Sequence, residues 1–234
     1  MLCQTANITT FRTWILLIVI LCSACSQTGF QYIDRHYCEH RQFSASLLVM
    51  PLNSVFLDSS NLFDPSDLNI LANHRFSWAE LNYFNNYMGS ALSEITTARI
   101  LGIDPYFRLY GIKFKKEHLA GPDTPSMEMF CPESGIIRFN NITPDYVLFF
   151  ESLYFDKEYQ ESMNNIGNGT NQNYSMEAGL KYLLWDNHIE KVIGFGQFSK
   201  YINLLHYPKK ETYIELFEDY ARAIIASSPF INKS

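Results

Sequence analysis

The first 24 residues most constrain this chain, because they decide which part of it is left to fold. Arg12 is the only charged side chain there, and an unbroken apolar run over residues 14–21 and the small residues Ser23 and Ala24 follow it. A positive start, an apolar stretch and small residues before a cut site are the anatomy of a secretory signal. The run is too short to span a bilayer, which takes about 20 apolar residues. We therefore expect residues 1–24 to be removed and about 210 residues to fold.

Cys25 directly follows this leader and indicates a particular kind of cut site, that of a lipoprotein. The ending Ser23-Ala24-Cys25 resembles the bacterial lipobox, in which the leader is removed and the cysteine becomes the lipidated first residue. The usual box has Leu three places before the cysteine, whereas here Cys22 stands there and Leu21 lies one step further back. The resemblance implies a membrane-anchored bacterial envelope lipoprotein with lipid on Cys25. The alternatives are an ordinary secretion signal, with Cys25 incidental, and an uncleaved anchor.

The composition fits a folded, exported domain. The chain is 47% hydrophobic and 18% charged, which is enough apolar material for a core. Its formal charge of −6 becomes −7 when Arg12 leaves with the leader. Binding of nucleic acid rests on clustered Lys and Arg, so we expect no nucleic-acid partner.

The residue after Cys25 bears on which membrane holds the protein. In enteric bacteria an Asp at this position marks lipoproteins that stay in the inner membrane, and this chain has Ser26 there. We therefore expect a location in the outer membrane, facing the periplasm.

Two cysteines remain for the folded domain, because Cys3 and Cys22 leave with the leader and Cys25 takes the lipid. In an exported protein, Cys38 and Cys131 are the candidate pair for one disulfide. Such a bond would close a loop of roughly 90 residues and contribute about 4 kcal/mol in the chain-entropy model. Two free thiols are the equal alternative.

Residues 25–44 are polar and aromatic without a clear period, and we expect a lipidated tether that docks onto the domain. Within them, His36, Cys38 and His40 alternate in a way that suits metal ligation. A closed zinc site takes four ligands, and this short cluster lacks the rest. We therefore expect a surface segment with neither a metal nor another cofactor.

Two amphipathic helices are predicted, each behind a capping box in which a hydroxyl and a carboxylate satisfy free amides. The boxes are Ser77-Trp78-Ala79-Glu80 and Thr212-Tyr213-Ile214-Glu215. Apolar residues then repeat at three and four, to about residue 98 in the first helix and to the Ser227-Ser228-Pro229 stop in the second. These stripes are Leu81, Phe84, Met88, Leu92 and Ile95, then Tyr213, Leu216, Phe217, Tyr220 and Ile224.

Strands are predicted from apolar and β-branched runs. Residues 45–52 form a continuous apolar run, as in a strand buried on both faces, and residues 145–155 are the best strand in the chain. Residues 180–186 and 191–201 indicate a hairpin around Asn187-His188. Gly194 and Gly196 on its second arm would leave a structural bulge or a groove for a ligand backbone. Weak strands are expected at 107–114 and 136–139.

The remaining segments are rich in Asn, Gly, Pro and Ser and are expected to be loops, over 53–76, 117–135 and 157–175. The resulting order is strand, helix, weak strands, strand, hairpin and helix. This order predicts one α+β domain over 45–226, with a mixed β-sheet and two principal amphipathic helices packed on it, and a C-terminal tail over 227–234.

Two short sequence motifs within these elements resemble those of a known protein family. They are Thr143-Pro144-Asp145-Tyr146-Val147-Leu148 and Leu184-Trp185-Asp186 followed by a turn and Lys191-Val192. The chain resembles, over roughly 45–226, the amino-terminal domain of TolB, the penicillin-binding-protein activator lipoproteins and the curli-secretion lipoprotein. Phe149 and Phe150 depart from the family's pattern, in which a glycine often follows Asp-Tyr-Val.

The resemblance implies a non-enzymatic accessory that binds an envelope protein or assists assembly, with Asp145, Tyr146, Trp185 and Asp186 as structural residues and no catalytic ones. An oligomer formed through an exposed sheet edge, as in the curli-secretion relatives, is a further reading. An accessory of this kind should expose an apolar or aromatic patch.

The alternative from another class is a hydrolase of envelope or extracellular polymers. Glu151 and Asp156 lie near the end of the best predicted strand, and a carboxylate pair held about 5–10 Å apart can cleave glycosidic bonds. The sequence has no G-x-S-x-G elbow, phosphate loop or H-E-x-x-H helix. A hydrolase should show a cleft with perturbed ionisable groups.

Overall fold

The fold was analysed in a computed structural model, which describes residues 27–42, 44–52, 78–102, 112–163 and 170–230. The strands are β1 Gln27–Ile33, β2 Ser46–Val49, β3 Arg99–Leu101, β4 Lys113–Leu119, β5 Met127–Ser134, β6 Tyr146–Met163, β7 Thr170–Asp186 and β8 Lys191–Leu204. The helices are α2 Arg35–Glu39, α4 Trp78–Ile95 and α5 Lys210–Ala226.

One six-stranded sheet, in the order β1-β8-β7-β6-β2-β3, organises the molecule. The long strands β6, β7 and β8 are antiparallel, whereas β2 is parallel to both β6 and β3. Leu47, Leu48 and Val49 of β2 are buried, as their continuous apolar run predicts for a parallel strand between neighbours. The mixed sheet with its helices confirms the α+β class.

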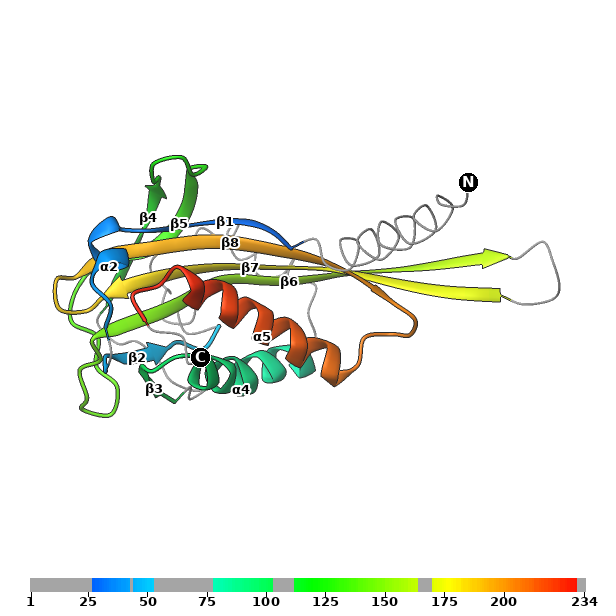
Figure 1. The fold of residues 1–234 in the computed structure, drawn as a ribbon, viewed down its shortest axis with the longest axis horizontal. Helices are drawn as coiled ribbons and strands as arrows, with labels where there is room; N and C mark the ends of the chain where they lie inside the picture. Colours follow the sequence, from blue (N-terminus) through cyan, green and yellow to red (C-terminus); the bar gives the residue numbers. More distant parts are fainter. Residues whose placement is uncertain (1–26, 43, 53–77, 103–111, 164–169, 231–234) are drawn as a thin grey trace, which may run out of the picture.

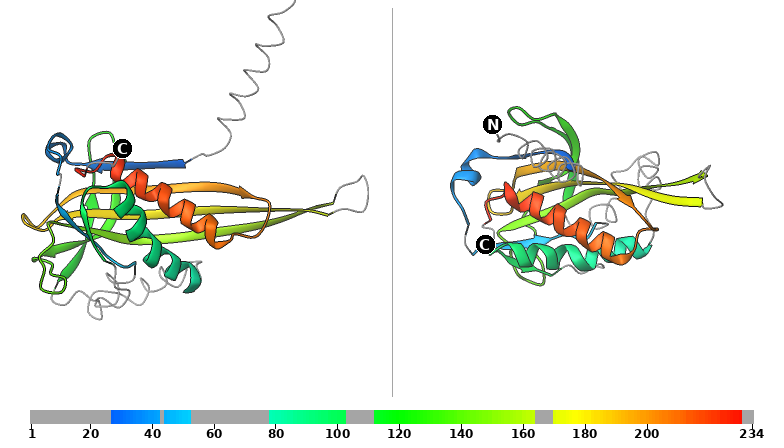
Figure 2. Two further views of the ribbon diagram at one scale, coloured as in Figure 1. Left: turned by 60° about the horizontal axis from the view of Figure 1, so that its bottom comes forward. Right: turned by 45° about the vertical axis from the view of Figure 1, so that its right-hand side comes forward.

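Each face of the sheet has its own hydrophobic core. Helices α4 and α5 lie side by side on one face (Figures 1 and 2), and Phe84 of α4 stacks edge-on against Phe150 of β6, with ring centroids 4.8 Å apart. The small sheet of β4 and β5 covers the other face, where Phe114 meets Phe149 at 5.8 Å. Neighbouring β6 residues thus serve different cores, because side chains alternate along a strand.

Both predicted helices are present as α4 and α5. Ser77 of the first capping box lies outside the described residues. The second helix begins at Lys210, so its N-cap is Lys209 and not Thr212. Thr212 lies inside the first turn, where its hydroxyl accepts a hydrogen bond from the Lys209 amide at 3.4 Å. Within the described part of the chain, we find no helix with the length and apolar character needed to cross a membrane.

The domain is longer at both ends than the sequence indicates. Residues 27–33, expected in the tether, form β1 and pair with β8. Phe230, expected in the tail, is buried and packs edge-on against Tyr146 at 5.3 Å. Described residues on both sides of the expected 45–226 domain, from Gln27 to Phe230, therefore contribute to the sheet and the core.

The glycines of β8 explain why β1 is part of the sheet. A Cβ atom on Gly194 would lie 2.2 Å from Ile33 Cδ1, and one on Gly196 would lie 2.9 Å from the Phe30 carbonyl oxygen. Strand β1 thus occupies the space beside Gly194 and Gly196, which had been expected as a possible groove for a ligand. A register shift between Leu184 and Trp185 places a bulge beside Gly194, which confirms the structural alternative.

Two segments expected to be loops are paired strands. Most of 117–135 belongs to β4 and β5, and most of 157–175 continues β6 and β7 into a hairpin that projects beyond the helices (Figure 1). Residues 136–139 are not a strand, since Phe139 makes only an isolated bridge to Ile142. The expected loop 53–76 and most of the expected strand 107–114 lie outside the described residues.

Candidate binding surfaces at the two ends of the sheet

The exposed large apolar side chains of the described residues gather at opposite ends of the long strands. The turn-end surface lies at the β7–β8 turn and the β5–β6 connection, and the hairpin-end surface lies beside the projecting β6–β7 hairpin (Figure 1). The turn-end surface consists of Ile136, Ile142 and Ile189, and the hairpin-end surface of Tyr159, Tyr201, Leu205 and Tyr207. An exposed apolar patch is the feature expected of an accessory protein.

A buried amide holds the turn-end surface together. The Asn187 side chain donates to the carbonyl oxygens of Ile137 at 2.9 Å and Pro144 at 2.8 Å, and accepts from the Ile137 amide at 2.8 Å. Glu190 adds a second link by accepting from the Gly135 amide at 2.6 Å. These bonds fasten the β5–β6 connection to the β7–β8 turn, so Ile136 and Ile189 are carried on one fixed platform.

Two of the predicted structural residues brace the same platform. Asp145 accepts from the Ser46 amide and hydroxyl, both at 2.7 Å, and its other oxygen hydrogen-bonds His188 Nε2 at 2.8 Å. Burial raises the pKa of Asp145, but the bonds from His188 and Ser46 outweigh it and the net shift is downward. A carboxylate with several donors is stabilised in its charged form.

Asp186 completes the brace on the next strand. It accepts from the Tyr37 hydroxyl at 2.7 Å and from the amides of His188 at 2.8 Å and Ile189 at 3.2 Å. Burial, followed by this bond to Asp186, raises the pKa of Tyr37. The other two predicted structural residues, Tyr146 and Trp185, are buried in the two different cores. The structure thus brings Asp145 and Asp186 together around His188, in a structural role.

Glu151 and Asp156 do not form a facing pair. Glu151 stands at a bulge in β6, where it accepts from the Phe130 amide at 3.0 Å, and its Oε2 atom is buried without a hydrogen-bond partner. Burial raises its pKa against the opposing effects of the Phe130 amide and two lysines. Asp156 is five residues further along the strand, about 16 Å away at the usual rise. That separation exceeds the range of a glycosidase pair.

Cys38 and Cys131 carry free thiols, the first exposed on α2 and the second buried on β5. Burial, with a smaller contribution from Glu117, raises the pKa of Cys131 to about 12. The rings of His36 on α2 and His40, which directly follows this helix, lie 4.5 Å apart. Across the described ranges, no three His, Cys, Asp or Glu side chains are grouped to hold a metal ion.

At the hairpin end, a buried ion pair clamps the two strands to the helices. Glu80 of α4 is only 3% exposed, pairs with the Lys157 ammonium and accepts from the Tyr213 hydroxyl at 2.5 Å. Beyond this clamp the rings of Tyr159 and Tyr174 pair across the strands at 5.1 Å, and Tyr207 meets Tyr174 edge-on at 6.1 Å. The hairpin therefore leaves the body from a fixed base.

The sequence did not single out either surface. Ile136 was expected in a weak strand, and Tyr159 fell in a segment expected to be a loop because of its Asn and Gly content. The spacing of Lys157 and Tyr159, which share one face of a strand, was the available signal for the hairpin. Two of the turn-end isoleucines lie in the β5–β6 connection and the third in the β7–β8 turn, so the sequence alone does not bring them together.

A hollow between α4 and β3 is a further surface feature of the described residues. Its lining combines two amides and two hydroxyls with apolar groups, and Glu94 is the only carboxylate among the lining residues. One exposed carboxylate supplies neither an acid–base pair nor a metal site. The hollow is lined by Asn85, Asn86, Gly89, Ser90, Ser93, Glu94, Ile100 and Gly102.

No family model matches the sequence, and no curated protein matches it. Among solved structures, the chain is similar to two dodecamers of PelC from Paraburkholderia phytofirmans. The first, at 8% identity and a TM-score of 0.43, covers 87% of this chain and 98% of that one. The second, a point variant at 9% identity and a TM-score of 0.34, covers 82% and 92%. At such low scores and identities, neither likeness establishes a family, an assembly or a function for this chain.

Proposed function

We propose that this chain is a non-enzymatic bacterial envelope lipoprotein, anchored by lipid on Cys25 in the outer membrane and facing the periplasm, which binds a protein partner. The suggested relation to the TolB, penicillin-binding-protein activator and curli-secretion domains is part of this proposal. The observation that carries it is the turn-end surface, with three exposed isoleucines on one hydrogen-bonded platform.

The platform suits protein binding because it is already ordered. Ile189 is 52% exposed on a turn whose backbone is fixed by Asp186 and whose neighbour Asn187 is fully buried. Ordering side chains and loops is a major cost of association, so a fixed apolar surface binds with a smaller loss of entropy. His188 and Arg138, both exposed, supply a polar rim of the kind that surrounds an interface core.

The location of the platform also suits a membrane-held accessory. Strand β1 begins at Gln27, opposite Lys200, and runs to Ile33, opposite Gly194, which is close to the β7–β8 turn. The chain therefore arrives from Cys25 on the hairpin side, and the turn-end surface lies toward the other end of β8. A lipid on Cys25 would leave the isoleucines free to meet a partner away from the membrane.

The first experiment tests the anchor. Intact mass is measured on the protein extracted from membranes, beside a Cys25→Ala variant. We expect a chain that starts at Cys25 and carries acyl mass, and we expect the variant to lack that mass and leave the membrane fraction. An unacylated chain, processed equally in the variant, would contradict the lipid anchor.

The second experiment tests the binding surface in intact cells. A photo-reactive amino acid replaces Ile189 in one strain and the exposed Arg222 of α5 in a control strain. We expect an adduct with another envelope protein from position 189 and none from position 222. An adduct of twice the chain mass would identify a second copy as the partner. Absence of an adduct at position 189 would contradict the proposal.

A further inference from the structure

We infer that the hairpin-end surface rests on the lipid surface that holds the anchor, so that the domain touches its membrane through side chains as well as through lipid. This inference depends on the lipidation of Cys25 proposed above. It concerns Tyr159, Tyr201, Leu205 and Tyr207, which lie at the opposite end from the proposed protein-binding platform.

The first argument is the distance that the chain permits between the anchor and this surface. Gln27 is paired with Lys200 in the β1–β8 ladder, so Tyr201 is the next residue along β8. Only Ser26 separates Gln27 from Cys25, and two extended residues reach about 7 Å. A lipid on Cys25 therefore enters its bilayer within a short distance of Tyr201 and of the β8–α5 connection that follows.

The second argument is the chemistry of that connection. Leu205 is 81% exposed, more than the other exposed large hydrophobic side chains among the described residues, and exposed Tyr207 follows two positions later. Lys209 and Lys210 then present exposed ammonium groups. Tyrosine favours the boundary between water and lipid because its ring is apolar and its hydroxyl is polar. Lysines beside a bilayer are attracted to anionic headgroups.

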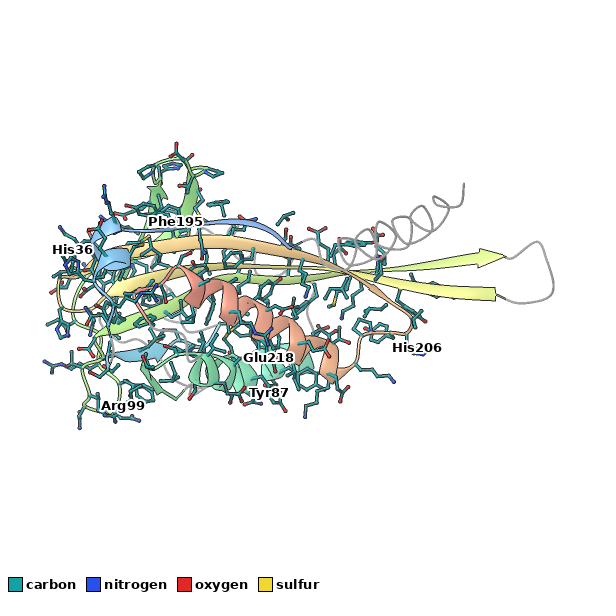
Figure 3. The ribbon with its side chains drawn as sticks, in the orientation of Figure 1. His36, Tyr87, Arg99, Phe195, His206 and Glu218 are labelled. Atoms are coloured by element: carbon teal, nitrogen blue, oxygen red, sulfur yellow. The ribbon has the colours of Figure 1, made fainter. Side chains whose placement is uncertain are left out.

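The two ends differ in a way that favours lipid at this one. The turn-end surface exposes isoleucines and no tyrosine, with Lys191 beside them, whereas the hairpin-end surface combines three tyrosine rings and one leucine with the neighbouring Lys209 and Lys210. Figure 3 labels His206 in the β8–α5 connection, just ahead of α5 and on the side of the molecule toward which the β6–β7 hairpin projects. An exposed leucine in such a connection can enter the headgroup boundary without any change in the fold.

The hairpin itself does not enter the hydrocarbon. Residues 160–163 and 170–173, which continue the two strands beyond Tyr159 and Tyr174, are polar apart from Met163. Two strands of an open hairpin would leave backbone groups unpaired in lipid, at a high cost. The tyrosine pair therefore marks the depth of the inferred contact.

The test uses the acylated protein in vesicles of phosphatidylethanolamine and phosphatidylglycerol. In a Cys38→Ser background, which removes the exposed thiol, Leu205→Cys is labelled with an environment-sensitive fluorophore. Ile189→Cys is the matched control, because it is another exposed apolar residue and lies at the turn end. Nitroxide-labelled lipids report which label approaches the bilayer.

We expect the label at 205 to shift to the blue and to be quenched severalfold more strongly than the label at 189. Equal quenching at the two positions, or none at 205 in protein that floats with the vesicles, overturns the inference and leaves the anchor standing. A shift at 205 in native membranes but not in pure lipid would mean that a protein covers this surface, and also overturns it. Protein that does not float defeats both the anchor and the inference.

Discussion

The side chain of Asn187 supplies three of the hydrogen bonds that join the β5–β6 connection to the β7–β8 turn. Its amide group satisfies both the amide and the carbonyl of Ile137, together with the carbonyl of Pro144, in a site without access to water. Each of these groups would be left unpaired in the interior if the side chain were removed. An unpaired buried polar group costs about 1–3 kcal/mol.

Replacement of Asn187 by alanine should lower the free energy of unfolding by about 3 kcal/mol, because three hydrogen bonds to buried backbone are lost together. The loss is measured by urea unfolding. The matched control is Asn86→Ala, at an exposed position on α4, which should change stability by less than about 0.5 kcal/mol. Equal effects of the two variants would show that the platform does not depend on this amide.

Glu151 and Asp145 should give opposite pH dependences. The pKa of Glu151 is raised above its ordinary 4.5, so its stabilising contribution is complete below that value and is lost as pH rises through the folded pKa. The pKa of Asp145 is lowered below its ordinary 3.8, so its contribution is present above that value and is lost as pH falls through the folded pKa.

The check is the free energy of unfolding as a function of pH for Glu151→Gln and Asp145→Asn. The first variant should lose the decline in stability that begins above pH 4.5, and the second should lose the decline below pH 3.8. Glutamine retains an oxygen for the Phe130 amide. A steeper decline above pH 4.5 in Glu151→Gln would contradict the assignment.

At the scale of elements, the β6–β7 hairpin depends on a clamp at its base. Lys157 of β6 pairs with Glu80 of α4, and Tyr213 of α5 donates to the same carboxylate, so one buried charge joins three elements. Lys157 also lies over the rings of Tyr207 and Tyr213, at 5.5 and 5.8 Å. The clamp sets where the strands leave the body.

Lys157→Met should destabilise the protein by about 3 kcal/mol, because it leaves the buried Glu80 carboxylate without its cation. A second change, Glu80→Gln, should recover part of that loss in the double variant. Thermal unfolding of the four proteins gives the coupling between the two residues. Arg35→Met, which breaks an exposed pair with Glu39, serves as the control and should have little effect. Additive losses in the cycle would contradict the clamp.

The sequence predicted those elements whose pattern is local. Helices α4 and α5 follow from apolar repeats, and the buried strand β2 follows from its continuous apolar run. The hairpin of β7 and β8 was predicted, but β6 and β7 were expected to be shorter, because the extension is polar and its tyrosines meet only in the paired strands. Strands β4 and β5 were missed because Pro122, Pro125 and Pro132 indicate a loop.

Strand β1 and the two candidate surfaces depend on pairing between segments that are distant in the sequence. Strand β1 shows no period of its own and is specified by the glycines of β8, some 160 residues later in the chain. The same holds for the candidate surfaces. Asp145 and Asp186 were identified as structural residues, yet nothing local indicates that they meet through His188 or that they support Ile189.

For the whole molecule, the two cysteines of the described residues report whether the fold is intact. Cys38 is exposed and should react with a thiol reagent in the native protein, whereas Cys131 is buried and its pKa of about 12 keeps it protonated. We expect one adduct by mass in native buffer and two in urea, with Cys131→Ala giving one in each. If neither thiol reacts until a reductant is added, the two are joined and the free-thiol state is wrong.

If Cys25 is the lipidated first residue, as proposed above, its closeness to β1 would set an order of events in maturation. A protease that cuts before Cys25 must grip an extended stretch around its target, and that stretch adjoins the first residues of β1. Pairing of β1 with β8 and capture of the cut site then compete for the same few residues. In a lipoprotein of this design, the outermost strand would join the sheet last, after the leader is gone, and completion of the fold would itself signal that processing is finished.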